Sequence, residues 1–548
     1  MTLFPQISTF FKSRQGLTLR ENLTAYLFLS PALLLILVFG IFPVGFAFFV
    51  SLYRWRRFPD EYVGLSNYVR SLDNLAYVLF FWLAIGAFVY ACVILRRIWQ
   101  QYTAKVQALS ALVPAAISSL AIGSLLGWIV LLLPVILDIP QRLRGQTQVP
   151  GAFVNEFFAS FQVSEIASAG NQFVLFGLFA LVSSVAWLRL IQMPQRITVL
   201  VQATTLAIAA LIGTLILLLT FTEIQAATLE NSLPVWSQII FISAGAALLV
   251  SAYVLWTRAV KQDGDRRFVV YAIAAVMLVV GGYALALELP RALQNSDPEV
   301  LRGFGITVMF ALGTVPFQLA LGLGLACLLF QNIKGKAFFR VVYFLPYIMP
   351  FVATSIVFNL IFSHRPTSLA NKMLEIVGVT PQKWLLEPTG IVPLLFGGQV
   401  PDFLTGPSLA LIVIMIYTTW TYIGYDAAVF LAGLGNISPE LYEAARIDGA
   451  SGWAIFRYIT LPLLSPTTFF LSLIAVIGTF QAFTQIWIMR NPASQKSVDT
   501  LGVHIFETVR STDPNMGYGS AMAFVLFGVI LLLTLFQNRV MGSKVFYG

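Results

Sequence analysis

The sequence predicts an all-α, polytopic membrane protein with about twelve transmembrane helices. Hydrophobic residues make up 58% of the 548 residues and charged residues only 10%, and the mean hydropathy is +0.83. A soluble protein of this length needs a charged surface on several domains, and no stretch here is long and polar enough to supply one. The apolar residues instead fall into runs of about 20, the length that crosses a bilayer as a helix.

Twelve runs are predicted to span the membrane. The first comes after a short basic segment, and it is too long for the apolar core of a signal peptide and lacks an obvious small-residue cleavage site, so we expect a retained helix. An even number of spans places both termini on one side of the membrane. The runs lie near residues 25–50, 74–95, 107–137, 168–188, 198–222, 236–257, 268–287, 304–330, 341–362, 408–433, 461–488 and 518–537.

The distribution of charge predicts that both termini are cytoplasmic, because Lys and Arg concentrate in cytoplasmic loops. With this orientation the inner segments hold 19 Lys and Arg and 6 Asp and Glu, whereas the outer segments hold 14 and 17. Only Arg54, Arg56 and Arg57, just after the first span, run against the trend. The net charge of +9 is therefore a topology signal, and no nucleic-acid partner is expected. The predicted location is the cell inner or plasma membrane.

The sequence holds no pattern typical of an enzyme or a metal site. Both cysteines, Cys92 and Cys327, lie inside apolar runs, so a disulfide framework is not expected. The two histidines, His364 and His504, are distant in sequence, and no cluster of acids and histidines supports a membrane-embedded transferase or hydrolase. Gly335-Lys336-Ala337 is the nearest approach to a phosphate loop, and it does not match the G-x-x-x-x-G-K-[ST] pattern. We predict no catalytic residues, no metal and no cofactor.

Residues 437–462 form a water-compatible segment between two apolar runs. Ser438 is a good N-cap, Pro439 suits the first helical position, and Glu440 favours the positive end of the helix dipole. Gly449 can turn the backbone through a positive φ, and Ser451 can cap a second short helix. This second helix carries three apolar side chains on roughly one face: Trp453, Phe456 and Ile459. The expected product is a helix, a glycine turn and a second helix that project from the membrane.

This segment resembles the EAA loop of ABC importer permeases. The resemblance rests on two triplets, Glu443-Ala444-Ala445 and Asp448-Gly449-Ala450, and on Phe456 and Leu461-Pro462 after them. The resemblance implies that the loop lies in a cleft of a separate ATPase subunit, where a glutamate at position 443 pairs with a basic group. The implied docking residues are Glu443, Ala444, Ala445, Asp448, Gly449 and Ala450. The capping residues alone would also suit an ordinary cytoplasmic loop.

Other segments resemble the carbohydrate permeases among these importers. Residues 62–68, with the sequence YVGLSNY, are similar to an element that precedes the second core span. Residues 331–340 and the proline-containing run after them are similar to a basic cytoplasmic turn and the span next to it. Pro346 and Pro350 are expected to disturb this span, which a membrane tolerates where neighbouring helices or a water-filled cavity satisfy the freed backbone groups.

The order of these segments predicts an insertion. The continuation of the core after residue 68 appears only near residue 296, and about six extra helices lie between. We therefore predict a cytoplasmic N-terminus and first core helix at 1–72, an inserted helical bundle at 73–295, and the rest of a six-span permease core at 296–548. An even number of extra helices preserves the topology of the later spans. The alternative is that the extra spans are ordinary helices of a larger transporter; no internal repeat supports inverted halves.

The spans on either side of residues 437–462 supply aromatic, hydroxyl and amide groups, which suit a neutral sugar. By resemblance to maltose permeases, Tyr425 and Thr479 match sugar-lining positions, although Gly478 and Ala482 depart from the pattern. The same side chains would also serve packing and hydrogen bonding between helices. The candidate substrate residues are Trp420, Tyr425, Thr479, Phe480, Gln481, Thr484 and Gln485.

The predicted function is that of the permease subunit of an ATP-driven ABC importer for sugars or oligosaccharides. The expected partners are a second permease subunit, two ATPase subunits, an extracytoplasmic solute-binding protein and membrane lipid. The outer segment from His364 to Ser408 is the expected receiver of the binding protein. The alternative is an ion-coupled secondary transporter, because Asp426 is an acid inside a span. Asp426 stands alone in sequence, which favours a pore-facing or helix-pairing role.

Overall fold

The computed structural model describes residues 14–542 except 57, 103–104, 145–150, 192, 232–234, 260–264, 332, 398–399 and 402–403. The described part is almost entirely helical and contains one antiparallel hairpin, formed by β1 (Tyr53–Trp55) and β2 (Pro59–Tyr62). The all-α prediction is confirmed. The chain divides into two compact units: unit 1 comprises Met1–Asn67, Asn74–Glu288 and Asn515–Ala521, and unit 2 comprises Tyr68–Asp73, Leu289–Pro514 and Met522–Gly548.

The described residues contain ten helices that are long and apolar enough to cross a membrane, and up to twelve spans if each of two bent helix pairs is one span. Each predicted run overlaps one of them, so the prediction of about twelve spans is confirmed. The disturbance expected at Pro346 and Pro350 is a 96° bend between Lys336–Ile348 and Phe351–Ile361. The prediction of one helix at 461–488 is wrong, because a 64° bend separates Gly452–Leu463 from Ser465–Phe480 and the helix breaks again after Phe480.

Prolines explain both bends. In the first pair, α15 (Lys336–Ile348) and α16 (Phe351–Ile361) are separated by Met349, which is extended, and Pro350. A residue before proline disfavours the helical region, and proline itself has no N–H to donate. In the second pair, the break at Leu464 lies between Pro462 and Pro466.

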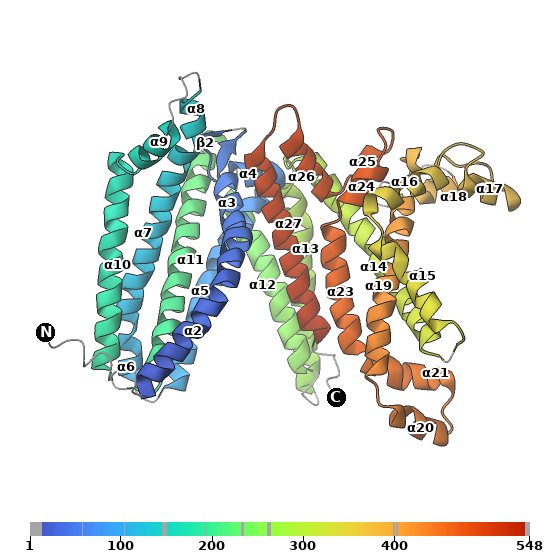
Figure 1. Cartoon of the computed structure of the whole chain (residues 1–548), viewed down its shortest axis with the longest axis horizontal. Coiled ribbons are helices and arrows are strands. Elements are labelled where there is room, and N and C mark those ends of the chain that lie inside the picture. Colours follow the sequence, from blue (N-terminus) through green and yellow to red (C-terminus); the bar gives the residue numbers. More distant parts are fainter. Residues whose placement is uncertain are drawn as a thin grey trace. The chain divides into compact units, whose positions relative to one another are not determined.

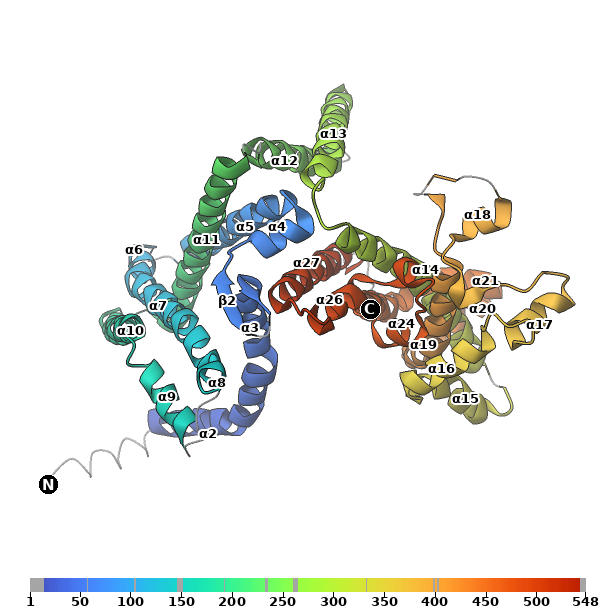
Figure 2. The same cartoon turned by 90° about the horizontal axis from the view of Figure 1, so that it is seen from above.

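Unit 1 holds the first span, the hairpin and the helices between residues 75 and 288. The first span begins in α2 (Arg14–Leu35), passes through the π-helix η1 (Ile36–Ile41) and ends in α3 (Phe42–Ser51). In Figures 1 and 2, α10, α7, α11 and α5 lie next to one another in a row. The other elements are α5 (Leu75–Gln101), α6 (Lys105–Ser110), α7 (Leu112–Leu137), α8 (Ile139–Arg142), α9 (Ala152–Ser160), α10 (Ser164–Leu190), α11 (Arg196–Asn231), α12 (Val235–Ala259) and α13 (Asp265–Ala292), whose last residues belong to unit 2.

One end of this row is held by a shared apolar cluster and by side-chain hydrogen bonds. Ile98, Ala111 and Val199, from α5, the turn before α7 and α11, are buried together. Beside them, Trp187 Nε1 of α10 donates to Ser110 Oγ at 2.9 Å. Four helices of unit 1 are therefore joined at this end by packing and by a hydrogen bond between side chains.

The YVGLSNY element is anchored inside unit 1. Gly64 has φ of +52°, and a Cβ atom at this position would collide with the carboxylate of Glu223 on α11. This carboxylate accepts a hydrogen bond from the Leu65 backbone N–H. Asn67 Nδ2 donates to the Ser51 carbonyl oxygen at 2.8 Å and to the Tyr53 carbonyl oxygen at 3.0 Å. Glycine and asparagine in this element thus have local structural functions.

Unit 2 holds the segments that resemble a permease core. Its elements are α4 (Ser66–Leu72), which begins at the unit boundary, α14 (Pro298–Phe330), α15, α16, α17 (Leu369–Ile376), the 3₁₀ helix η2 (Trp384–Leu386), α18 (Ile391–Phe396), α19 (Leu409–Gly435), α20 (Pro439–Ile447), α21 (Gly452–Ile455), the π-helix η4 (Phe456–Thr460), α22 (Leu461–Leu463), α23 (Ser465–Phe480), α24 (Thr484–Met489), α25 (Gln495–Val498), α26 (Leu501–Arg510) and α27 (Met516–Val540), whose first residues belong to unit 1.

The centre of unit 2 is the parallel pair α14 and α19. Gly313 of α14 faces Met415 of α19, and nine residues later Gly322 faces the Cβ atom of Asp426. Glycines allow this close approach because they have no side chain. Asp426 is only 2% exposed, and within the described residues its Oδ2 atom has no hydrogen-bond partner. Of the two expected roles for Asp426, the structure favours helix pairing.

The two ends of the predicted insertion meet in unit 2. The backbone N–H of Asp297 donates to the Arg70 carbonyl oxygen at 3.1 Å. The backbone N–H of Asn295 donates to Asp73 Oδ2 at 2.9 Å. Residues 222 positions apart are therefore joined by hydrogen bonds at the points where the predicted bundle begins and ends.

Candidate functional site

The segment 437–462 folds as two short helices around a glycine turn, and Figure 1 shows α20 and α21 beyond the lower ends of α19 and α23. Gly449 has φ of +75°, and the Ala450 N–H donates to the Ala445 carbonyl oxygen at 2.9 Å, as in a Schellman turn. Ser451 caps α21 by accepting from the Ala454 N–H at 3.2 Å. Ser438 occupies the N-cap of α20, but its side chain makes no capping bond, so that part of the prediction is wrong.

The acidic side chains of this projection are exposed. Glu443 and Asp448 both lie at the surface, and within the described residues no ion pair includes either of them. Ala445 is buried, and its carbonyl oxygen accepts the hydrogen bond from Ala450 that closes the glycine turn. Tyr442 Oη and Thr460 Oγ1 lie 3.3 Å apart in a hydrogen bond between the two halves of the segment. The projection therefore has a defined shape and carries free negative charge.

Large apolar side chains are exposed on the same projection. Ile447 is 86% exposed, Tyr458 75% and Trp453 70%. Phe456 and Ile459, expected on one face with Trp453, are half-buried, and the rings of Trp453 and Phe456 lie 5.5 Å apart. The helix after Ile455 continues as η4, a π-helix that the sequence did not predict. A group of large exposed apolar side chains marks an interaction surface, for another protein or for the membrane.

A cluster of tyrosines lies where α15 meets α19. The ring of Tyr425 is stacked on that of Tyr347, with centroids 4.8 Å apart and planes 24° apart. Tyr422 meets Tyr347 edge-on at 5.8 Å, and Phe351 lies 6.2 Å from Tyr422. Tyr347 was not among the sequence candidates. Its place beside Pro346 made it look like part of a helix bend, and only the packing of α15 on α19 brings it to Tyr425.

The other substrate candidates do not gather with Tyr425. Trp420 packs against Phe358, with ring centroids 5.2 Å apart, in the apolar core around Tyr417. Thr479, Phe480 and Gln485 are buried. Gln481 is exposed at the end of α23, and Thr484 is half-buried. Their role in binding stays a prediction.

One buried amide holds residues 363–384 together. Asn371, 1% exposed, donates from Nδ2 to the carbonyl oxygens of Ser363, Arg365 and Gln382. Its Oδ1 atom accepts from the Gln382 N–H at 2.9 Å and from Trp384 Nε1 at 2.7 Å. A fully bonded buried amide rigidifies the chain around it. In Figure 1, α17 and α18 lie at the opposite end of unit 2 from α20.

A charge cluster that the sequence did not predict lies near α26. Arg490 pairs with Asp499 at 3.0 Å and with Glu507, and its guanidinium lies 4.1 Å from the centroid of the Trp487 ring. Burial raises the pKa of Asp499 to about 6, against the opposing effect of Arg490. Arg490 is 9 residues from Asp499 and 17 residues from Glu507 along the chain. Neither separation matches the spacing of a helix turn, so the sequence did not predict these ion pairs.

Comparisons with known proteins identify the family of this chain. The family of binding-protein-dependent transport system inner membrane components matches residues 318–545. The lactose transport system permease protein LacF of Rhizobium radiobacter is 30% identical over 247 residues, which cover 44% of this chain and 76% of LacF. The chain belongs to this family. The sequence-based resemblance to ABC importer permeases of the carbohydrate type is confirmed.

Other relatives of this permease carry related names. The arabinooligosaccharides transport system permease protein AraP of Bacillus subtilis is 33% identical over 42% of this chain and 66% of its own length. The sn-glycerol-3-phosphate transport system permease protein UgpA of Agrobacterium fabrum is 29% identical over 46% and 79%. A crystal structure of a bacterial ABC transporter that imports alginate matches 45% of this chain and 80% of that chain, with 21% identity and a TM-score of 0.39.

Proposed function

We propose that this membrane permease is the channel-forming subunit of an ATP-driven importer for sugars or oligosaccharides. The observation that carries the proposal is the projection at 437–462, with exposed acidic groups and exposed apolar side chains on two short helices. Family membership supplies the context, since the matching family is named for binding-protein-dependent transport. The ATPase activity itself is expected on separate subunits.

The projection suits transmission of force. Docked in an ATPase cleft, Glu443 would pair with a basic group, and Ala444, Ala445, Asp448, Gly449 and Ala450 would form the narrow tip. The half-buried Tyr442 packs with the buried Leu464 and Leu434 in one apolar cluster, so the tip is coupled to α19 and to the helix bend before α23. Movement of docked ATPases would then exchange inward-open and outward-open states of the path.

A charge reversal tests the docking. The Glu443→Lys chain, purified from its own membrane with co-purifying subunits, is expected to lose its ATPase subunits at least tenfold relative to the wild type. The matched control is Glu165→Lys, the same reversal at an exposed position in the first turn of α10, and it should retain them. Equal retention by Glu443→Lys would remove the docking proposal.

Sugar binding is proposed at the tyrosine cluster of α15 and α19. Stacked tyrosine rings with a hydroxyl at each tip offer an apolar face and hydrogen bonds together, which suits a neutral sugar. Names of relatives support this class, since AraP and LacF are named for arabinooligosaccharides and lactose. Tyr347 joins Tyr425 in this proposal; Trp420, Thr479, Phe480, Gln481, Thr484 and Gln485 remain candidates for later stages of the path.

We also propose that residues 73–295 are an insertion into a six-span core made of 1–72 and 296–548. The hydrogen bonds between Arg70 and Asp297 and between Asp73 and Asn295 support this, because inserted domains commonly enter and leave at neighbouring points. The matching family covers only residues 318–545, beyond the bundle. The family match therefore supports the core and leaves the bundle outside it.

The proposed orientation is based on the distribution of Lys and Arg. It puts both termini and the loop at 437–462 in the cytoplasm, and it puts α17 and α18 on the extracytoplasmic side of the membrane. The outer segment would then receive the solute-binding protein on a surface that Asn371 holds in shape. A second permease and two ATPase subunits complete the proposed assembly.

Ion-coupled transport is the second candidate, and Asp426 is the observation that favours it. A buried carboxyl group with an oxygen that lacks a hydrogen bond within the described residues can take up a proton. In inside-out and right-side-out vesicles without ATP, uptake that depends on a proton gradient and is lost in Asp426→Asn would support this candidate. Uptake that does not depend on the proton gradient would exclude ion-coupled transport and leave ATP-driven import as the remaining proposal.

A further inference from the structure

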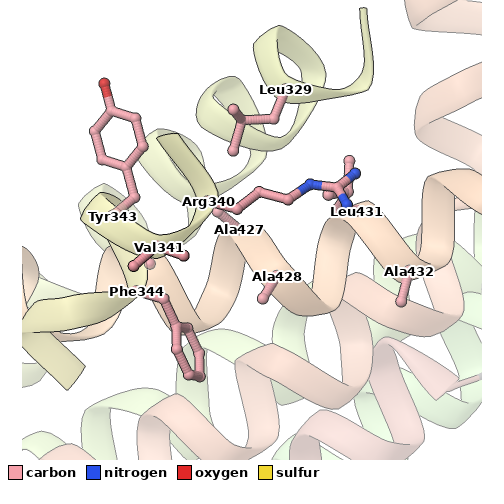
Figure 3. Close-up of a pocket in the computed structure, with 10 residues that line it drawn as sticks. Leu329, Arg340, Val341, Tyr343, Phe344, Ala427, Ala428, Leu431 and Ala432 are labelled. Atoms are coloured by element: carbon pink, nitrogen blue, oxygen red, sulfur yellow. The ribbon is translucent and has the colours of Figure 1, made fainter. Parts of the chain in front are cut away.

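An open groove of about 570 Å³ lies in unit 2 between α15 and α19, and neither Tyr347 nor Tyr425 of the proposed sugar site lines it. Its size is within the range of small-ligand sites, about 300–1,000 Å³. Its walls are Phe344 of α15 and Leu329 of α14, and its floor is the stripe Ala428, Leu431 and Ala432 of α19. Figure 3 shows these residues around the open space.

The groove has a structural cause. At Gly424 the two helices touch so closely that a Cβ atom would collide with the Tyr343 carbonyl oxygen. Beyond this contact the facing residues of α19 are mostly alanines, and Ala428 and Ala432 are exposed. Small side chains on one wall leave an apolar channel that runs along α19 toward its C-terminal end.

Arg340 is the only charged residue that lines this groove. Figure 3 shows its side chain extending along α19 so that the guanidinium group lies beside Leu431. The described structure records no hydrogen bond or ion pair for Arg340, and none of the lining residues is acidic. The nearest acid along α19, Asp426, faces Gly322 of α14. The guanidinium group is therefore available to an anion.

Arg340 lies near the end of its helix, beside two further basic residues. Arg340 lies four residues into α15, or about 6 Å along the helix, and Leu431 lies one turn before the end of α19. Lys334 and Lys336 lie in and just after the turn that begins α15, and Lys336 Nζ donates to the Phe330 carbonyl oxygen. Basic groups at the ends of membrane helices attract anionic headgroups, and a basic pocket between such helices binds them specifically.

We propose that this groove binds an anionic phospholipid, with an acyl chain along Ala428 and Ala432 and the phosphate on Arg340. An apolar channel with one unneutralised cation at its mouth matches an amphiphile that has a long chain and a negative head. The guanidinium group can donate two parallel hydrogen bonds to phosphate oxygens. Binding in this place would hold α15 against α19, beside the tyrosine cluster. The proposal does not depend on the sugar or on the ATPase partners.

Photolabelling tests the site in the full chain purified with its co-purifying subunits. The probe is phosphatidylglycerol with a diazirine in one acyl chain, in nanodiscs, and a phosphatidylcholine with the same diazirine is the neutral comparison. We expect phosphatidylglycerol to label peptides from 336–348 or 421–435 at least fivefold more than phosphatidylcholine. Arg340→Gln and the groove-filling Ala428→Leu should each lower this labelling at least fivefold, and Arg340→Lys should keep part of it.

Lys334→Gln is the matched control, because it removes a neighbouring cation that does not line the groove, and its labelling should be unchanged. Thermal unfolding of each variant, compared with the wild type, separates loss of the site from loss of the fold. Equal labelling of wild type and Arg340→Gln would overturn the proposal, and so would equal labelling by the two lipids. A cysteine at Ala428→Cys that cross-links to a second permease subunit would assign the groove to that subunit and also overturn it.

Discussion

At the scale of single residues, the residue type at several positions is set by the lack of space for a side chain rather than by a functional group. Gly64, Gly424 and Gly322 each face atoms that leave no room for a side chain. Asn371 organises a whole loop through five hydrogen bonds. The sequence predicted the importance of Gly64 only through a resemblance. The structure gives the physical reason, which is the carboxylate of Glu223 placed against it.

Gly64→Ala is expected to destabilise unit 1. The residue has φ of +52°, and the new methyl group would collide with the Glu223 carboxylate. The left-handed conformation alone costs about 1–2 kcal/mol for a residue with a side chain. Thermal unfolding in detergent should show a lower Tm. Gly86→Ala, in α5 with no atom near the added methyl group, is the control and should not lower it.

The charge cluster around Arg490 predicts a pH dependence. Burial raises the pKa of Asp499 to about 6, above its ordinary value of 3.8, so the folded chain takes up this proton more readily than the unfolded chain does. The contribution of Asp499 to the free energy of unfolding should therefore increase as the pH falls from about 7 to about 4. Tm measured across this range should rise more in the wild type than in Asp499→Asn. Parallel profiles for the two proteins would contradict the assignment.

At the scale of helices, the sequence located every span and missed how two of them bend. Apolar runs report length and burial, and these are satisfied equally by a straight helix and by a broken one. Pro346 and Pro350 indicated a disturbance but not its size, which is a 96° angle between α15 and α16. Their spacing also did not show that α15 packs against α19. The packing of α15 on α19 stacks Tyr347 on Tyr425. The two residues are far apart in sequence, so their spacing did not predict this contact.

Gly424→Ala should weaken the contact of α15 with α19. The added methyl group would meet the Tyr343 carbonyl oxygen, which belongs to a backbone that cannot turn away, and overpacking of this kind costs about 1–3 kcal/mol. Both Tm and substrate uptake should fall. Gly435→Ala, at the end of the same helix with open space around it, is the control. A Gly424→Ala protein with unchanged Tm would contradict the described packing.

At the scale of the whole chain, composition was sufficient to predict a membrane protein, and the runs of about 20 apolar residues were sufficient to predict about twelve spans, since both average over many residues. The candidate site was less predictable. The projection at 437–462 is local, so its turn, its second cap and its exposed face could be predicted from spacing. The sugar candidates come from distant segments, and the structure groups Tyr425 with Tyr347 while it buries Thr479 and Gln485 elsewhere.

Removal of the bundle tests the insertion. A chain that joins Asp73 to Asn295 through a short glycine-serine linker should still insert in the membrane, because the joined ends already share a hydrogen bond. It should also retain the ATPase subunits that dock on 437–462. Protease protection and co-purification measure these two properties. Failure of residues 296–548 to insert would contradict the proposed core.

The central claim is that ATP hydrolysis, transmitted through the projection at 437–462, drives import. The most direct measurement is uptake of labelled sugars and oligosaccharides into vesicles that contain the complete assembly, with ATP supplied only on the side of the loop. We predict uptake that requires ATP, ignores a proton gradient and is abolished by Glu443→Lys. Uptake that continues without ATP and depends on the proton gradient would contradict the claim.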